Sequence, residues 1–209
     1  MTFTRAIGMA CNKVILLIVR ALALSKIHPN VLTFLGLVIN IGAAALLAVG
    51  QFRWAGAVII GAGLFDMVDG RVARETNRVT RFGGFFDSVL DRYSDLALLV
   101  GLLVWYGSIN RWWYVVLTAV VMTGSVMVSY TRARAENTIP TCKVGFMERP
   151  ERVVLLIIGA LFDKMAPVLW VIAILGNLTV VHRMIFTWQE TKRLEEAQLR
   201  PAGSRAATS

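Results

Sequence analysis

Four aspartates stand close together in an otherwise apolar part of the sequence, and their spacing suggests a shared chemical task. Asp66 and Asp69 are three positions apart, and Asp87 and Asp91 are four positions apart. Residues at these spacings share one face of a helix, so two neighbouring antiparallel helices can direct all four carboxylates to one point. Carboxylates this close repel one another unless a cation compensates their charge. We therefore expect these aspartates to bind metal.

The ligand atoms limit the kind of metal. Oxygen-only ligands suit Mg²⁺, Mn²⁺ or Ca²⁺, and the absence of a nearby histidine or cysteine in the sequence argues against Zn²⁺. Two divalent ions about 3.5–4 Å apart, clamping a phosphate under attack, would use all four carboxylates. We expect two ions, Mg²⁺ or Mn²⁺, as cofactors.

Small residues and an arginine accompany the aspartates. Gly70 and Gly83 would let a ligand approach the backbone closely, and Ala73 is also small. Arg74 could hold an oxygen of a diphosphate. Together with the metal, these residues predict a site for a phosphate-containing ligand.

The rest of the chain predicts an all-α integral membrane protein. Of its 209 residues, 56% are hydrophobic and only 17% are charged, with a mean hydropathy of +0.63, which is too apolar for a soluble domain of this size. Apolar stretches of about 18 residues or more indicate membrane-spanning helices. Six spans are expected, and the fifth needs its polar start near Glu148 to cross. Their approximate ranges are 31–50, 52–70, 84–107, 112–131, 152–163 and 166–187.

Basic residues predict the orientation. Only Arg53, Arg111 and Lys164 fall in the first, third and fifth connections, whereas the other connections and both ends are rich in arginine and lysine. Positive residues favour the cytoplasmic side, so we expect both termini and the aspartates on the cytoplasmic face of an inner membrane. The formal net charge of +9 suits anionic lipids and phosphorylated substrates. Basic residues confined to helix ends argue against nucleic acid as a partner.

Three segments are expected along the chain. In residues 1–30, Phe3 and Ile7 begin an apolar stripe with polar residues opposite, which is typical of an amphipathic helix lying on the cytoplasmic leaflet. Residues 31–188 form the six-helix transmembrane catalytic domain. Residues 189–209 form a polar cytoplasmic tail that continues briefly as a helix.

The aspartates and small residues together form one longer pattern, Asp-x2-Asp-Gly-x2-Ala-Arg-x8-Gly-x3-Asp-x3-Asp. With this pattern and six spans behind an interfacial helix, the chain resembles the CDP-alcohol phosphatidyltransferases over nearly its whole length. The resemblance implies that Asp66, Asp69 and Asp87 ligate metal, and that Asp91 completes the site and acts as general base. It also implies CDP-diacylglycerol as donor, CMP as leaving group and a homodimer. The implied donor-binding residues are Gly70, Ala73, Arg74 and Gly83.

The acceptor alcohol should be selected outside this pattern. The stretches "ARAE" and "ERPER" resemble the branch of the family that makes phosphatidylinositol phosphate from inositol phosphate. The resemblance implies that Arg132, Arg152 and Arg183 bind the phosphate of the acceptor. Position 132 departs from the branch pattern, which would have a lysine there. Lys143 and the remaining basic residues near span ends are interpreted as determinants of topology and contacts to lipid headgroups.

Other hypotheses stay open. Phosphatidylglycerophosphate synthase, which uses glycerol 3-phosphate, is the nearest alternative branch. A cation transporter would place polar groups near mid-bilayer on broken helices, whereas these acids cluster at two helix ends beside arginines. A non-catalytic lipid-binding scaffold would not need a complete set of acids. Asp95 extends the row of acids by one turn, and it fits an internal hydrogen bond as well as a supporting role at the site.

Overall fold

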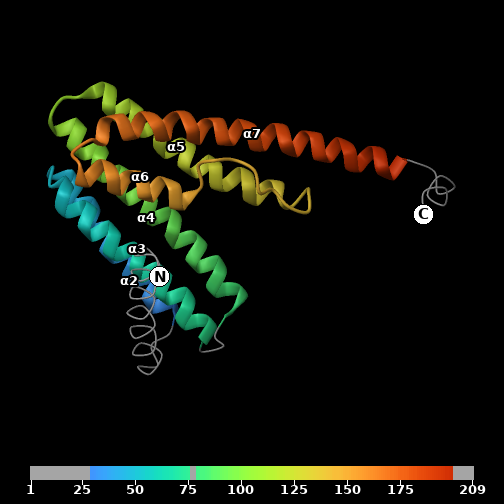
Figure 1. Ribbon diagram of the computed structural model, residues 1–209, viewed down its shortest axis with the longest axis horizontal. Coiled ribbons are helices and arrows are strands. Elements are labelled where there is room, and N and C mark those ends of the chain that lie inside the picture. The colour runs from blue at the N-terminus through green and yellow to red at the C-terminus, as the bar shows by residue number, and fades with distance from the viewer. Residues whose placement is uncertain (1–28, 76–78, 200–209) are drawn as a thin grey trace, which may run out of the picture.

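The computed structural model describes residues 29–75 and 79–199, without the side chains of 29, 67–75 and 198–199. Six helices and no strand make up this part of the chain (Figure 1). They are α2 (Pro29–Ala48), α3 (Phe52–Glu75), α4 (Arg81–Ser108), α5 (Trp112–Ala135), α6 (Arg149–Leu161) and α7 (Met165–Leu199). Each helix overlaps one predicted span, which confirms the all-α fold. The predicted amphipathic helix falls almost wholly outside the described residues.

The six helices pack as a closed ring. α2 packs against α3 and α4, α4 against α5, α5 against α7, α7 against α6, and α6 against α3. Figure 1 shows α5 and α7 along the top of the molecule, α2 and α3 at the lower left, and α4 and α6 between them. The ring brings together helix ends that are far apart in the sequence.

Three tight turns join helices, and each contains a residue in the left-handed region. Gly50, Asn110 and Asp163 have φ values of 78°, 55° and 55°. Glycine, asparagine and aspartate tolerate this conformation best. At Gly50 an added Cβ would also lie 2.4 Å from the Trp105 ring, so the turn between α2 and α3 requires glycine. The two longer connections, which join α3 to α4 and α5 to α6, lead into the site described below.

Apolar side chains fill the space between the helices. Leu47, Leu102 and Leu169 are completely buried in a core to which α2 to α7 all contribute. The backbones of α2 and α4 approach closely at Gly101, where an added Cβ would lie 2.3 Å from the carbonyl oxygen of Ala44. Small residues at such crossings are typical of helices packed in membranes.

The outer surface is also apolar. Trp54 and Trp113 are 69% and 87% exposed, and many aliphatic side chains are exposed with them, as on a surface that faces lipid. Within the described residues, three helices are long and apolar enough to cross a membrane. These are Asn30–Ala48, Trp112–Ala135 and Met165–Ala197. Spanning by α3, α4 and α6 stays a prediction, and α6, with 13 residues, is only about 20 Å long.

Candidate active site

Two helices supply the acidic residues of the site. Asp66 lies in the second half of α3, and Asp87, Asp91 and Asp95 follow one another along α4 from its second turn to its middle. The carboxylate of Asp91 is close enough to the other three to interact with each electrostatically. The structure therefore brings together three of the four predicted metal ligands. The side chain of the fourth, Asp69, lies outside the described part of α3.

The start of α4 is set by a local cap. The Thr80 hydroxyl accepts a hydrogen bond of 2.9 Å from the backbone N–H of Gly83. Such a bond satisfies one of the free N–H groups of the first turn. The helix consequently begins at Arg81, which places Asp87 and Asp91 in its second and third turns.

A glycine on α2 makes room for Asp66. An added Cβ at Gly36 would lie 2.9 Å from the Asp66 Oδ1 atom. Real Cβ atoms essentially never come so close to another atom, so any larger residue would push the carboxylate aside. The neighbouring Gly42 on the same helix has nothing within 4 Å of such a Cβ. The close approach is therefore particular to the site.

One arginine contacts three of the carboxylates. Arg149, the first residue of α6, places its Nη2 atom 2.8 Å from Asp66 Oδ2 and its Nη1 atom 3.0 Å from Asp91 Oδ1. Its Nε atom lies 3.4 Å from Asp95 Oδ1. Each of the three guanidinium nitrogen atoms thus faces a different carboxylate. Together these contacts join α6 to α3 and α4.

A second arginine completes the pairing of Asp95. The Nη2 atom of Arg152 lies 2.7 Å from Asp95 Oδ2, and the two side chains are only 5% and 9% exposed. A buried ion pair has to be well bonded to offset the cost of removing both charges from water. Asp95 meets this condition, because each of its oxygens faces an arginine.

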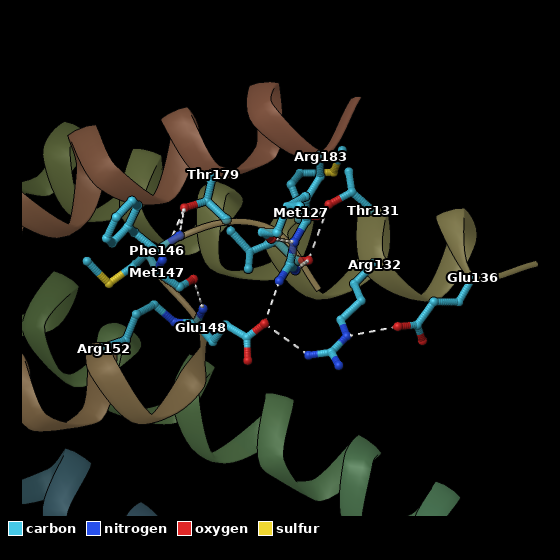
Figure 2. Close-up of polar contacts among 12 residues, drawn as sticks. Met127, Thr131, Arg132, Glu136, Phe146, Met147, Glu148, Arg152, Thr179 and Arg183 are labelled. Carbon is cyan, nitrogen blue, oxygen red and sulfur yellow. Dashed lines mark hydrogen bonds and ion pairs between the residues drawn. The ribbon is translucent and has the colours of Figure 1, made fainter. Parts of the chain in front are cut away.

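Glu148 joins two more arginines. The Glu148 Oε1 atom lies 2.7 Å from Arg183 Nη2 and 3.0 Å from Arg132 Nη1 (Figure 2). Arg132 also contacts Glu136 at 3.1 Å, while Arg183 is 1% exposed and donates to the carbonyl of Val128. Figure 2 shows the Glu148 carboxylate between the two guanidinium groups.

These arginines line a pocket next to the aspartates. The pocket has a volume of about 430 Å³, and α4, α5, α6 and α7 all contribute to its wall. Arg132, Arg149 and Arg183 are among its lining residues, together with Ser88 and Glu148. Because Arg149 also contacts Asp66 and Asp91, the pocket adjoins the acidic cluster. Its cationic wall suits an anion such as a phosphate.

The loop that carries Glu148 is shaped by α7. The Thr179 hydroxyl accepts hydrogen bonds from the backbone N–H groups of Phe146 and Met147, at 3.3 and 3.1 Å (Figure 2). The Arg183 Nε atom donates to the carbonyl of Val144 at 2.8 Å. Between them, Gly145 has a φ of 111°, and an added Cβ there would lie 2.3 Å from Thr179. The loop is therefore fixed by side chains of another helix.

On the other side of Arg149 lies an apolar cavity of about 380 Å³. Aliphatic side chains of α3, α4 and α6 dominate its lining, and Asp66, Asp95 and Arg149 form its charged part. A ligand with a charged group and a hydrocarbon part could therefore place the two parts in adjoining regions.

The sequence model of the CDP-alcohol phosphatidyltransferase family matches residues 26–191, a range that includes Asp66 to Asp91. The chain belongs to this family. It is 36% identical over 177 residues to archaetidylinositol phosphate synthase of Pyrococcus horikoshii, covering 84% of this chain and 90% of that protein. It is 33% identical over 199 residues to phosphatidylinositol phosphate synthase of Mycobacterium tuberculosis, covering 90% of this chain and 92% of the relative.

Solved structures of this phosphatidyltransferase family share the fold. The crystal structure of Mycobacterium tuberculosis phosphatidylinositol phosphate synthase with CDP-DAG bound has a TM-score of 0.79 and 32% identity, covering 84% of this chain and 94% of that one. The same enzyme in complex with manganese and citrate has a TM-score of 0.76 and 33% identity, covering 82% and 87%. The likeness therefore extends from the sequence to the packing of the helices.

The acidic cluster of this phosphatidyltransferase fits a divalent cation by its chemistry. Its donors are all carboxylate oxygens, which suit Mg²⁺ or Mn²⁺. Among the described side chains, no group of three or more acids, histidines or cysteines is arranged to hold a metal. Arg149 forms ion pairs with one oxygen each of Asp66 and Asp91, and the side chain of Asp69 is not described.

The remaining predicted residues have different outcomes. Gly70, Ala73 and Arg74 fall where the structure describes no side chains, so their predicted roles stay predictions. Arg132 and Arg183 meet at one pocket, as the acceptor hypothesis requires. The third predicted acceptor residue, Arg152, points to Asp95 and forms no part of the wall described for that pocket.

Two residues of the site were missed in the sequence. From the sequence, Glu148 is assigned only to the start of a span, and Arg149 only to topology and contacts with lipid headgroups. The available signal was Pro150, because proline in the first turn of a helix marks its N-terminus. A helix with Pro150 in its first turn has Glu148 and Arg149 at its start, on the side of the membrane where the aspartates are also expected.

Proposed function

We propose that this phosphatidyltransferase transfers a phosphatidyl group from CDP-diacylglycerol to a hydroxyl of inositol phosphate and releases CMP. The observation that carries the proposal is the arginine-lined pocket, which adjoins the acidic cluster through Arg149. A phosphorylated acceptor in this pocket would have its hydroxyl groups within reach of the carboxylates. Family membership, in turn, favours this enzyme over a cation transporter or a lipid-binding scaffold.

The donor would be held by the acidic cluster and by the apolar cavity beside it. Two Mg²⁺ or Mn²⁺ ions, bound by Asp66, Asp69, Asp87 and Asp91, would neutralise the diphosphate and make CMP a better leaving group. The apolar cavity beside Asp66 would take the start of the lipid part. The relative whose structures were solved with CDP-DAG and with manganese and citrate supports these assignments. Gly70, Ala73, Arg74 and Gly83 are proposed to contact the CDP part of the donor.

Asp91 is proposed to act as general base. A carboxylate near the acceptor hydroxyl can take its proton while the oxygen attacks the phosphorus atom of the lipid phosphate. Asp91 suits this task, because it lies between Asp87 and Asp95 on the helix face that meets Arg149. Proton removal and attack would then take place at the boundary between the acidic cluster and the pocket.

The acceptor's phosphate is proposed to lie against Arg132 and Arg183. Guanidinium groups offer several donors in one plane, which suits phosphate oxygens. Arg152 stays in the proposal, and it would have to leave Asp95 to reach the phosphate directly. The two kinds of relative differ in the lipid part of their names and agree on inositol phosphate, so the acceptor is better supported than the lipid.

We further propose the arrangement in the membrane. All six helices would cross it as a single catalytic domain of residues 31–188, with the amphipathic segment 1–30 and the tail 189–209 on the cytoplasmic side. The active site would open at the cytoplasmic face of the inner membrane, where a water-soluble acceptor can meet a lipid donor. A homodimer is proposed from the resemblance to the family alone.

The test is CMP release by the purified full-length chain. CDP-diacylglycerol and Mg²⁺ or Mn²⁺ would be supplied with inositol phosphate, glycerol 3-phosphate or free inositol, and EDTA would serve as the metal-free control. We expect release with inositol phosphate only, and none with EDTA. Release with glycerol 3-phosphate instead would replace the acceptor by that of phosphatidylglycerophosphate synthase. No release with any acceptor, from folded protein, would overturn the proposal.

A further inference from the structure

One guanidinium group holds most of the acidic cluster together. Arg149 from α6 contacts Asp66 on α3 and Asp91 on α4 at 2.8 and 3.0 Å, and Asp95 at 3.4 Å. Its side chain is 28% exposed, and those of Asp66 and Asp91 are 22% and 21% exposed, so little water screens these charges. Bringing carboxylates together in such surroundings is unfavourable without a cation, and Arg149 supplies one.

A metal ion would need the same oxygens. Mg²⁺ binds carboxylate oxygens at about 2.0–2.1 Å and requires nearly octahedral geometry. Asp66 Oδ2 already accepts a hydrogen bond from Arg149 Nη2, and Asp91 Oδ1 forms an ion pair with Nη1. A cation at these oxygens and a guanidinium group at hydrogen-bond distance would also repel each other. The two forms of charge compensation are therefore alternatives.

The structure offers Arg149 another position. The residue lines both the apolar cavity and the pocket that contains Arg132 and Arg183. That pocket, of about 430 Å³, is open enough to receive a displaced guanidinium group. A released Arg149 would there add a third guanidinium group to the wall proposed to bind phosphate.

We propose that Arg149 is a positioning residue that occupies the metal-binding oxygens before the ions arrive and competes with them for Asp66 and Asp91. This inference rests on the proposed function, since it requires the acidic cluster to be the metal site. Arg149 keeps the carboxylates together in the metal-free enzyme and lowers the apparent affinity for divalent ions. Ion binding releases its guanidinium group towards the neighbouring pocket.

The test measures Mn²⁺ binding rather than turnover. Free Mn²⁺ would be followed by electron paramagnetic resonance during titration of the purified full-length chain in detergent, without substrate. Arg149→Gln removes the competing charge, so the dissociation constant for Mn²⁺ should fall by about fivefold or more, as for other coupled binding events. Arg132→Gln is the matched control, because it removes the same charge from the same pocket without touching Asp66 or Asp91. It should change the dissociation constant by less than about twofold.

A second variant and a second measurement distinguish the loss of competition from a variant that simply fails to fold. Arg149→Lys keeps the charge but replaces the planar fork of three nitrogen atoms by a single ammonium group, so its Mn²⁺ affinity should lie between those of the wild type and Arg149→Gln. In EDTA, Arg149→Gln should melt at a lower temperature than the wild type, and saturating Mn²⁺ should remove most of the difference.

Each other outcome contradicts the inference. An unchanged or weaker Mn²⁺ affinity in Arg149→Gln would mean that the arginine does not compete with the ion. Equal tightening in Arg149→Gln and Arg132→Gln would reduce the effect to a general change of charge. If the wild type itself fails to bind Mn²⁺, the metal site of the proposed function falls, and this inference falls with it.

Discussion

Replacing Asp95 by alanine would leave the Arg152 guanidinium buried without its carboxylate. The Asp95 and Arg152 side chains are 9% and 5% exposed, and the distance between their charged atoms is 2.7 Å. The remaining contact of Arg152 is a long one of 3.5 Å to the carbonyl of Met147. Removing one partner of a buried ion pair costs about 3–5 kcal/mol, because the other charge stays out of water. For a chain of this size that corresponds to a fall of about 6–20 °C in melting temperature.

The assay is thermal unfolding of the purified protein in one detergent, and it needs two comparisons. The exposed pair of Arg53 and Asp163, 3.8 Å apart, is the control, and Arg53→Ala should cost less than about 1 kcal/mol. The double variant Asp95→Ala/Arg152→Met removes both buried charges and should recover much of the loss, because buried pairs can often be replaced by apolar residues. The reasoning is refuted if Asp95→Ala costs less than about 1 kcal/mol, or if the two substitutions are additive.

Three further predictions follow from the site and the packing. Gly36→Ala should displace the carboxylate that faces it and reduce turnover by about tenfold or more with little change in melting temperature, whereas Gly42→Ala should leave both unchanged. Equal turnover of the two variants would contradict this. Asp91→Asn should abolish CMP release while donor binding, measured by titration, stays largely intact; near-normal turnover would exclude it as the base. Gly101→Ala should destabilise the protein by about 1–3 kcal/mol through overpacking, and Gly107→Ala, with open space around its Cβ, should not. Equal melting temperatures would show that α2 and α4 can move apart without cost.

Much of the fold could be predicted because the signals were local. Long apolar stretches bounded by charge or by Gly, Pro and Asn mark helices regardless of what they pack against. The helix pattern of Asp87 and Asp91 could likewise be read directly, because residues four apart share a face. The ring of helices could not be predicted in this way, since no local signal specifies that α6 packs against α3 as well as against α7, the next helix in the chain.

The arginines of the site show the same limit. Arg149 lies 83 positions from Asp66 and 54 from Asp95, so its contacts depend on how three helices converge. Arg152, which the motif predicts at the acceptor phosphate, shares a face of α6 with Arg149, and both side chains contact Asp95. Both belong to one short motif, and only the convergence of the helices decides which carboxylates they meet.

The loop between α5 and α6 has a consequence for protein engineering. Its backbone shape at Val144 to Met147 depends on Thr179 and Arg183, which belong to α7. A loop transplanted from a relative with another acceptor would lose these contacts unless the matching α7 residues came with it. On the proposed function, acceptor preference would therefore not transfer with one contiguous segment of the chain. Chimeras that exchange loop and α7 positions together should fold where loop-only exchanges fail.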